Sequence, residues 1–569
     1  MCIRDSLFNM SCLPLIVGYG GINAGGRSIF DLSHQRMVFD DVNLEQQNEV
    51  LQSLGHLMGT TDRETILNKS LIRTIDNDFF NEHNYRSPEL PTLAGGQLPS
   101  GFNPATTYNA RQHPRGLAMT IFGLSDAVKS LGLPWEEILK IIPRQKISCV
   151  SGCAVAQADK FGMGGMFQAP LAKSRVTSKH MAMSLGEGSA DFGHSYVLGS
   201  MGSTGNYTGA CATFQYNLKL GISMIQSGES LISIVGAAES GIVPEIYEAF
   251  SATRGLAEDK NLLKLQKQLG EDFDSPNHRK ICRPFGENIG MILGESAQFV
   301  VLMQDSLALE LGLNIHGAAL SSHIHSDGYK KSISGPGAGN YLTVGKTFNE
   351  IKKHFSPDAF NKTFFHAHGT STPQNRESES HIISSISKAF GIEALPVTAI
   401  KSYLGHSLAA AGGDQMISTL GSWKNNLIPG ITSTPELAEN VHQENVEFLL
   451  QNKKFDEGDF DFAILNAKGF GGNNGTALVA SPFKTMKMLE SKYSKKDIQT
   501  YLDKKRKIDD QLDQHKNAIL QGDIKSRYMF GEDVIDGMND FEIETDKITN
   551  KLNKEIFDLN STLPYKDYL

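Results

Sequence analysis

Short apolar runs separated by glycine or polar turns recur along most of the chain. Runs of this kind, rich in β-branched residues, are typical of strands that are buried on both faces. They occupy residues 147–150, 231–235, 299–303, 364–367, 397–400 and 462–465. Segments with apolar residues at helical spacing lie between several of them, at residues 117–128, 214–227 and 378–390. Because strands alternate with helices, the pattern predicts an α/β fold.

The two ends of this pattern are distinct from its middle. Residues 13–18 are predicted to form a first buried strand that leads into a glycine turn. Residues 462–467 and 476–480 are predicted as two strands joined by the glycine-rich turn at 469–475, a hairpin that closes the core. Residues 1–9 lack the pattern of a signal peptide, so we expect a non-native or disordered extension there and a natural start at Met10.

Two polar segments interrupt or extend this core. Residues 60–100 contain prolines and no periodicity, which predicts a surface insertion. From about residue 484 the composition shifts to Lys, Asp, Gln and Asn, which predicts a charged, largely helical C-terminal extension over 484–569. The basic run at 504–507 is either a docking site for an acidic partner or, as is more common, a solvated helix face.

Composition narrows the class of protein. With 569 residues, 40% of them hydrophobic, the chain is long enough for two cores and too apolar for general disorder. Its net charge of -9 gives no overall attraction for nucleic acid, and no apolar run reaches the roughly 18 residues of a membrane span. Six cysteines without a CxxC pair predict neither a disulfide scaffold nor a zinc site, so a reducing cytoplasm is the expected compartment.

Cys211 is the candidate nucleophile. The sequence GACAT at residues 209–213 directly precedes a helical segment, so Cys211 is expected on a tight turn that opens a helix. Free backbone amides at a helix N-terminus stabilise a thiolate, which lowers the pKa of the thiol. Taken alone, Cys211 fits a small buried apolar residue equally well.

Two histidines follow predicted strands and favour the catalytic interpretation. His368 lies in HAHGTSTP after the strand at 364–367, and His406 lies in KSYLGHS, which also contains Lys401, after the strand at 397–400. Loops at the carboxyl ends of strands are where α/β folds keep active-site residues. No carboxylate stands at metal-ligand spacing from these residues, so we expect no metal site.

Four motifs resemble those of a known family. GACAT, HAHGTSTPQN, KSYLGHS and NAKGFGGNNG are similar to the signature motifs of β-ketoacyl-acyl carrier protein synthases, the condensing enzymes of fatty acid and polyketide synthesis. The resemblance extends from about residue 13 to 482. It implies a homodimer with a thiolase-like fold of five α/β/α/β/α layers. The two similar halves would occupy residues 10–304, with the nucleophile, and 305–483, with the two histidines and the GFGG turn.

The resemblance also implies roles for individual residues. Cys211 would accept the acyl group, while His368 and His406 would bind the malonyl thioester and promote loss of its carboxylate. Two neutral imidazoles that donate from Nε2 suit an enolate oxygen, which needs preorganised donors. Lys401 and Glu379 would support the histidines. The amides of Cys211 and Phe470, flanked by Gly469 and Gly471, would form an oxyanion hole, and Phe470 would also be a gate. Thr370 and Thr372 would bind phosphopantetheine.

The implied substrates are malonyl-acyl carrier protein and an acyl thioester, with CoA and phosphopantetheine arriving on the substrates and no cofactor of the enzyme's own. The chain is most similar to a divergent proteobacterial subgroup that starts fatty acid synthesis from acetyl-CoA. Lys468, Arg376 and the pair Asn473-Asn474 depart from the pattern of elongating synthases. An elongating or polyketide-type synthase and a non-catalytic partner resembling chain-length factors are the alternatives.

Recognition of the carrier protein is a separate question, because acyl carrier protein is strongly acidic. A docking surface should therefore present clustered lysine and arginine despite the net negative charge. Lys173, Arg175 and Lys179 are candidates, and ordinary surface charge explains them equally well.

Overall fold

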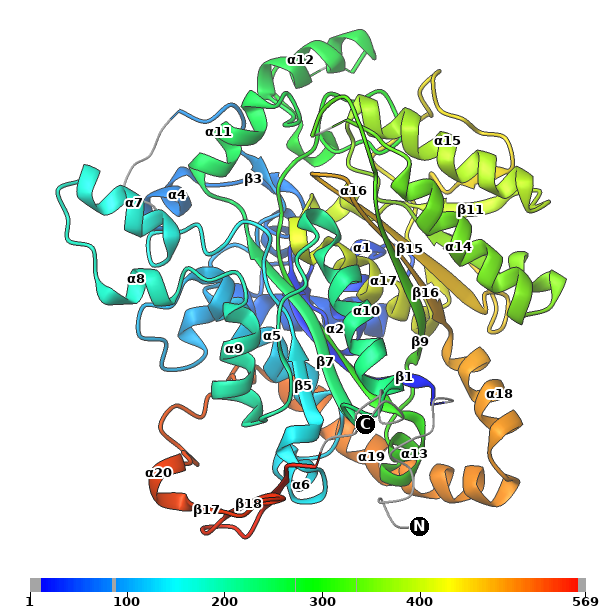
Figure 1. Cartoon of the computed structure of the whole chain (residues 1–569). Coiled ribbons are helices and arrows are strands. Elements are labelled where there is room, and N and C mark those ends of the chain that lie inside the picture. The colour runs from blue at the N-terminus through cyan, green and yellow to red at the C-terminus, as the bar shows by residue number, and fades with distance from the viewer. Residues whose placement is uncertain (1–11, 84–88, 272, 334, 561–569) are drawn as a thin grey trace.

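The computed structural model describes residues 12–83, 89–271, 273–333 and 335–560 (Figure 1). The extension expected at residues 1–9 and the expected start at Met10 lie outside these ranges.

The strands of the core form one continuous twelve-stranded sheet. Its order is β13-β11-β10-β15-β16-β9-β1-β8-β7-β5-β6, with β2 beside β1. Its strands are β1 (Pro14–Asn23), β2 (Gly26–Arg27), β5 (Ile147–Val150), β6 (Thr204–Gly205), β7 (Ile232–Ser240), β8 (Glu295–Gln304), β9 (Gly317–Ser326), β10 (Thr363–His366), β11 (Leu395–Thr398), β13 (Val446–Phe448), β15 (Phe462–Gly469) and β16 (Asn473–Ala480). Each apolar run predicted as a strand overlaps a strand of the sheet, although β11 ends at Thr398 and the run at 397–400 is a strand only in its first half. Two halves of the sheet meet where β1 pairs with β9 at Leu15↔Ala318 and Ile16↔Gly317.

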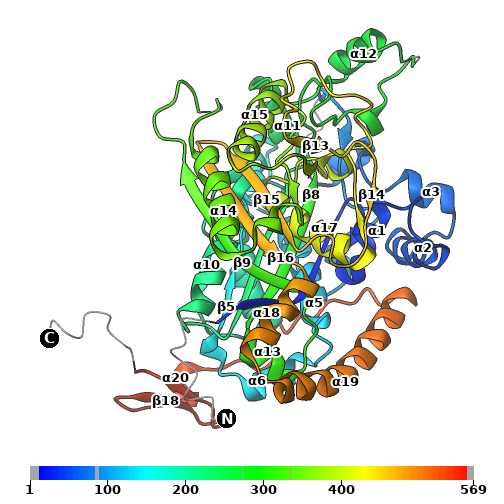
Figure 2. The same ribbon diagram turned by 90° about the vertical axis from the view of Figure 1, so that its right-hand side faces the viewer.

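Helices lie outside both halves and between them. The central helices are α10 (Thr213–Gln226), which contacts β7 and β9, and α17 (Ala411–Asn425), which contacts β8 and β15. On the outside, α5 (Arg115–Lys129) covers β1 and β8, while α14 (Gly339–His354) covers β9 and β16 beside α15 (Pro373–Ala389) (Figures 1 and 2). Because helices cover both faces, β1 and β8 are buried at every position, which explains the apolar runs within them, such as residues 299–303 of β8. The predicted five-layer thiolase-like fold is confirmed.

Much of residues 60–100 is buried, so the predicted surface insertion is wrong for this part. The helix α3 (Arg63–Asn68) is largely exposed, but Ile72, Ile75 and Ala94 are at most 1% exposed. They pack in one apolar cluster with Cys211. The strands β3 (Arg73–Thr74) and β4 (Ala94–Gly95) pair with each other, and α4 (Asn77–His83) lies between them in the sequence. Individual side chains are buried here without a regular backbone, so no periodic pattern could indicate it.

The C-terminal extension is helical only in its first part. It begins with α18 (Pro482–Lys492) and α19 (Lys495–Leu520), and α19 buries Tyr501, Ile508 and Leu512. In the basic run, Lys504 donates to the Glu310 carbonyl at 2.6 Å, so this face of α19 contacts the body of the protein. Beyond Leu520 the prediction of a largely helical extension is wrong. The short α20 (Gly537–Asp540) is followed by a sheet of β17 (Phe541–Ile543), β18 (Lys547–Asn550) and β19 (Ile556–Asp558).

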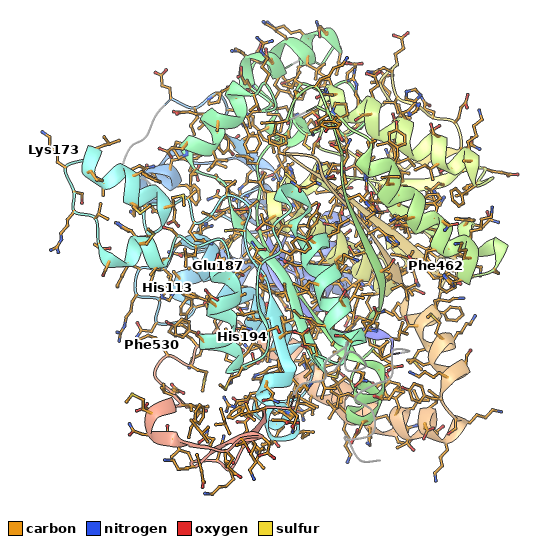
Figure 3. All side chains as sticks on the ribbon, in the orientation of Figure 1. His113, Lys173, Glu187, His194, Phe462 and Phe530 are labelled. Atoms are coloured by element: carbon orange, nitrogen blue, oxygen red, sulfur yellow. The ribbon has the colours of Figure 1, made fainter. Side chains whose placement is uncertain are left out.

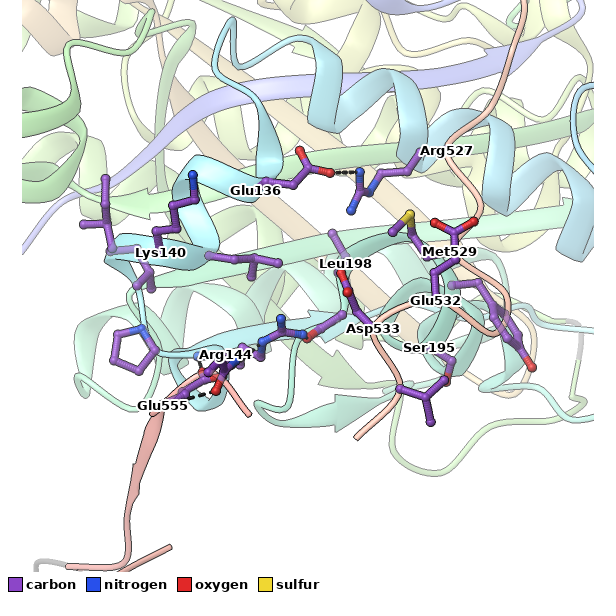
Figure 4. A pocket seen from close by; sticks show the side chains of 18 of the residues that line it. Glu136, Lys140, Arg144, Ser195, Leu198, Arg527, Met529, Glu532, Asp533 and Glu555 are labelled. Carbon is purple, nitrogen blue, oxygen red and sulfur yellow. Dashed lines mark hydrogen bonds and ion pairs between the residues drawn. The ribbon is translucent and has the colours of Figure 1, made fainter. Parts of the chain in front are cut away.

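A groove of about 990 Å³ separates the last part of the extension from α6 (Trp135–Ile141) and the loop that follows it (Figure 4). Ion pairs join its two walls: Arg527 pairs with Glu136, and Arg144 Nε lies 3.2 Å from Glu555 Oε2. Aromatic contacts add to them, with the rings of Tyr108 and Tyr528 4.7 Å apart. The extension is therefore attached to the body of the protein by contacts from residues 527–528 and from Glu555. None of the helices in the described ranges is long and apolar enough to cross a bilayer.

Candidate active site

Cys211, His368 and His406 line one cavity of about 400 Å³, although they are far apart in the sequence. Thr370, Thr372, Gly469 and Phe470 line the same cavity. Lys401 and Glu379 lie behind it, in hydrogen bonds to the His368 loop. The structure thus brings the residues that were singled out from the sequence together at one place.

Cys211 occupies the tight turn that the sequence predicts. It lies in a single 3₁₀ turn over Ala210–Ala212, and α10 follows immediately. Ala210 has a φ of 50°, a left-handed conformation that costs a residue with a side chain about 1 kcal/mol. A Cβ atom on Gly469 would lie 2.2 Å from the Gly209 carbonyl oxygen and 3.1 Å from the Cys211 nitrogen. Only glycine allows the turn after β15 to approach the nucleophile this closely.

The electrostatics of Cys211 differ from the sequence prediction. Burial raises the pKa of its thiol from 9.0 to about 11, while the Lys401 charge and the backbone amides of Phe470 and Cys211 lower it. The expected low pKa is therefore wrong, because the cost of burying a thiolate exceeds the stabilisation by nearby amides. The thiol is protonated at neutral pH.

The His368 loop is held by a buried carboxylate. One oxygen of Glu379 accepts a hydrogen bond from the His368 amide at 2.6 Å, and the other accepts from the Gly369 amide at 2.8 Å. Asn466 and Asn375 donate to the same two oxygens at 2.8 Å each. Lys401 Nζ donates to the His368 carbonyl at 2.6 Å. Both polar groups of the His368 backbone are thus fixed by charged side chains, which holds the imidazole in place.

His406 is positioned by backbone contacts. The helix α16 (Lys401–Leu404) ends at Gly405, whose φ is 73°, and the His406 amide then donates to the Ile292 carbonyl at 2.7 Å. The His368 and His406 rings lie edge to face with centroids 5.4 Å apart. Burial, and then the Lys401 charge, lower the pKa of both imidazoles well below 6.5, so both are neutral at pH 7.

The tautomer of both rings follows from their surroundings. Nδ1 of each ring is buried without a hydrogen-bond partner among the described residues. A buried N–H without an acceptor is costly, so we assign the proton to Nε2 in both rings. Since both histidines line the cavity, two N–H donors are then available to a substrate oxygen.

Two threonines and two aromatic rings also line the cavity. Thr370 Oγ1 and Thr372 Oγ1 lie 3.2 Å apart on the loop before α15. The Phe470 ring, 40% exposed, lies 5.7 Å from the Phe250 ring, and both rings line the cavity. Asn473 Nδ2 donates to the Phe470 carbonyl at 2.7 Å, which stabilises the glycine turn.

Several residues that sequence reasoning singled out lie outside the cavity. Arg376 forms a bidentate ion pair with Glu287 at 3.0 and 3.1 Å and does not line the cavity. Lys173 and Arg175 are exposed between α7 (Met163–Leu171) and α8 (Ser178–Ala182), and Lys179 is exposed within α8. Figure 3 shows Lys173 at the periphery of the molecule.

The structure also adds residues that sequence reasoning missed. Asn375 and Asn466 hold Glu379, and the ion pair of Lys330 with Asp327 at 3.1 Å lines the cavity. Asn375 and Asn466 lie within the quoted motifs, whereas nothing in the sequence near Asp327 signals its place. In the described ranges no group of three or more His, Cys, Asp or Glu side chains could hold a metal ion.

Comparison with known proteins identifies the family of this chain. The β-ketoacyl synthase N-terminal domain matches residues 193–308, and the β-ketoacyl synthase C-terminal domain matches residues 321–434. A β-ketoacyl-[acyl-carrier-protein] synthase of Pseudomonas aeruginosa is 36% identical over 622 aligned residues, which cover 95% of this chain and 97% of that protein. The 3-oxoacyl-[acyl-carrier-protein] synthase 2 of Staphylococcus aureus is 27% identical over 49% of this chain and 63% of its own length. The chain therefore belongs to the β-ketoacyl synthase family and is an acyltransferase-type condensing enzyme.

Within this family the chain is of the type of the Pseudomonas aeruginosa relative, which is named FabY. The crystal structure of the ketosynthase FabY from that organism matches with a TM-score of 0.92 and 35% identity over 99% of both chains. A β-ketoacyl synthase from Burkholderia phymatum matches with a TM-score of 0.61 and 20% identity, over 83% of this chain and 99% of that one, which shows the shared fold. The resemblance noted in the sequence is confirmed at the level of family and type.

Proposed function

We propose that this enzyme condenses an acetyl primer from acetyl-CoA with malonyl-acyl carrier protein, and so starts fatty acid synthesis. The observation that carries the proposal is the placement of one thiol and two neutral imidazoles, from Cys211, His368 and His406, on a single cavity. Both reacting carbons arrive as thioesters, so the reaction needs no metal or cofactor of the enzyme's own. The five described cysteines are free, which fits a reducing cytoplasm.

In the first half-reaction, Cys211 Sγ attacks the carbonyl carbon of acetyl-CoA. The bond from that carbon to the CoA sulfur breaks, and the proton of the Cys211 thiol leaves with the CoA thiol. The amides of Cys211 and Phe470 lie close enough to Sγ to lower the pKa of the thiol. They are therefore suited to stabilise the oxyanion that forms on the acetyl carbonyl.

In the second half-reaction, the malonyl arm lies along Thr370 and Thr372 and its thioester oxygen accepts from Nε2 of His368 and His406. The bond between the malonyl methylene and its carboxylate breaks, CO₂ leaves, and the electron pair passes to the enolate that the two imidazoles stabilise. The methylene carbon then attacks the acetyl carbonyl on Cys211, the C–Sγ bond breaks, and the thiolate takes a proton from solvent. Because the acyl group rests on the enzyme between the two steps, the kinetics are ping-pong.

A short primer is favoured by the two rings beside the nucleophile. Phe250 and Phe470 contact each other and both line the cavity with Cys211, which reduces the room for a long acyl chain. The test is the intact mass of the wild-type enzyme and of Cys211→Ala after incubation with acetyl-CoA or with a long-chain acyl carrier protein. An acetyl adduct that forms only on wild type and only from acetyl-CoA supports the proposal. A long-chain adduct makes the enzyme an elongating synthase, and no adduct from either donor would refute both the acetyl primer and the role of Cys211 as nucleophile.

We infer that the enzyme acts as a homodimer. The strand β6 lies at an open edge of the sheet, and Met201 and Tyr207 on either side of it expose 47% and 46% of their surface. An open edge flanked by exposed apolar side chains is a surface that a second copy can cover. Light scattering after size-exclusion chromatography should give twice the chain mass, and a single-chain mass at micromolar concentration would exclude the dimer.

We propose that the acidic carrier protein docks on exposed lysine and arginine. Lys173 and Arg175 are exposed and pair with no carboxylate among the described residues. Replacing both with glutamate should raise KM for the carrier-bound substrate and leave acetylation of Cys211 from CoA unchanged. Equal losses in both reactions would indicate a folding defect and would remove these residues from the docking surface.

A further inference from the structure

Lys468 places a positive charge on the wall of the catalytic cavity. It precedes Gly469 at the end of β15, on the same face of the strand as Asn466, two residues earlier. Its Nζ atom donates to Asn375 Oδ1 and to Ser378 Oγ of α15, both at 3.1 Å. No carboxylate among the described residues forms an ion pair with it within 4 Å, and both of its hydrogen-bond partners are neutral. Burial lowers the pKa of Lys468, while the more distant carboxylates of Glu379 and Asp327 raise it.

The other cationic side chains near the cavity are paired, exposed to solvent or placed behind the cavity wall. Lys330 is neutralised by its ion pair with Asp327 at 3.1 Å. Arg254 is exposed to solvent at the cavity's edge. Lys401 lies behind the wall, where its Nζ donates to the His368 carbonyl. Lys468 is thus a partly buried cation that lines the cavity and has no direct ion-pair partner among the described residues. An ammonium has three N–H donors, and two of them are used by Asn375 and Ser378.

The location of this charge restricts which part of a substrate it can meet. The Lys468 charge contributes to the lowered pKa of His368, so it acts close to the imidazole that holds the donor thioester. The acetyl primer and the β-ketoacyl product are neutral near the reacting carbons. The malonyl donor alone carries an anion there, the carboxylate on the methylene carbon.

We propose that Lys468 binds the carboxylate of the malonyl donor and is a specificity-determining residue for it. It thereby distinguishes a malonyl thioester from a neutral acyl thioester at the donor position. The inference rests on the proposed function, in which malonyl-acyl carrier protein is the donor.

The kinetic consequence follows from the fate of the carboxylate. Its negative charge is lost as CO₂ leaves, so the ion pair with Lys468 is stronger in the bound donor than in the transition state. An interaction of this kind lowers KM and does not raise kcat. Loss of Lys468 should therefore raise KM for the donor and leave kcat unchanged or higher.

The first test compares wild type, Lys468→Met and Lys468→Arg in steady-state condensation with saturating primer. We expect KM for malonyl-acyl carrier protein to rise at least about tenfold in Lys468→Met, with kcat no lower than in wild type. Lys468→Arg keeps the charge and should recover most of the loss. The matched control is Lys388→Met, which removes a lysine that is exposed on α15 and pairs with Glu444 at 3.0 Å, and it should behave as wild type. A fall in kcat at unchanged KM in Lys468→Met would overturn the inference, because Lys468 would then act through Asn375 and Glu379 on His368.

A second test needs no turnover. Malonyl-pantetheine and acetyl-pantetheine analogues with an amide in place of the thioester bind without reacting, and calorimetry gives their affinities. Wild type should prefer the malonyl analogue by tenfold or more, and Lys468→Met should lose that preference. Equal affinities in wild type would overturn the inference. If the proposed function is wrong, the intact-mass measurement shows no acetyl adduct on Cys211. That result is independent of the affinities measured here, so the two failures are distinguishable.

Discussion

Glu239, at the end of β7, makes the stability of this enzyme depend on pH. Its side chain is 1% exposed. One carboxylate oxygen accepts hydrogen bonds from the Ala154 amide at 2.7 Å and from the Ala409 amide at 3.4 Å. The other oxygen has no hydrogen-bond partner among the described residues. Burial raises the pKa of this carboxyl from 4.5 to about 7, although the amides of Ala154, Ala409 and Val155 lower it. A carboxylate at this position is therefore costly to the folded state.

The magnitude follows from proton linkage. Below pH 4.5 the carboxyl is protonated in both the folded and the unfolded chain, so its pKa shift has no effect on stability. Between pH 4.5 and 7 the unfolded chain loses this proton while the folded enzyme keeps it, so stability falls as pH rises. Above pH 7 the loss is complete, at about 3 kcal/mol for a pKa raised from 4.5 to about 7. Glu239→Gln cannot ionise and should escape this loss.

The assay is urea unfolding of wild type and Glu239→Gln at pH values from 5 to 9. The free energy of unfolding of the variant, relative to wild type, should increase up to pH 7 and stay constant above it. Curves that run parallel from pH 5 to 8 would refute the reasoning. Because the charge on Glu239 raises the pKa of Cys211, the variant should also react faster with iodoacetamide at pH 8.

Three further substitutions test other parts of the structure. His406→Asn should slow CO₂ release from malonyl-acyl carrier protein by about 10²-fold, because one of two donors to the enolate is altered; an unchanged rate would exclude His406 from this step. Glu379→Gln replaces one carboxylate oxygen with an NH₂ group, which cannot accept the hydrogen bond that a backbone amide donates there. We expect a loss of about 2–4 kcal/mol in the free energy of unfolding, measured with urea, and slower CO₂ release in a gas-release assay. Ile508→Ala, under the buried face of α19, should cost about 2–4 kcal/mol and speed proteolysis of the extension; unchanged cleavage would show that α19 is held by other contacts.

The sequence predicts the core of this fold well and its periphery poorly. Strands such as β8 are covered on both faces, so burial alone explains a continuous apolar run that can be read directly. Ile72 and Ile75 are buried by contacts with residues distant in sequence, and no local pattern records such contacts. The sheet β17-β18-β19 lies in a segment whose polar composition suggested helices.

The candidate site shows the same division. Cys211, His368 and His406 lie in local motifs, so they could be identified and their meeting in one cavity expected. The pKa of Cys211 could not be predicted, because it depends on how deeply the thiol is buried. The contacts of Lys468 with α15 could not be predicted either, because they join residues about 90 positions apart in the sequence.

The close approach of Gly469 to the Cys211 turn has a consequence for how the cavity can open. The backbone at Gly469 has no room to shift toward Gly209. Gly471 and Gly472, just beyond it, have φ values of 83° and 91°, which glycine adopts at little cost. Movement of the Phe470 segment is therefore confined to the side-chain bonds of Phe470 and to these two glycines. Such a movement would leave Gly469 against the Cys211 turn, so the cavity could widen while these two segments stay in contact.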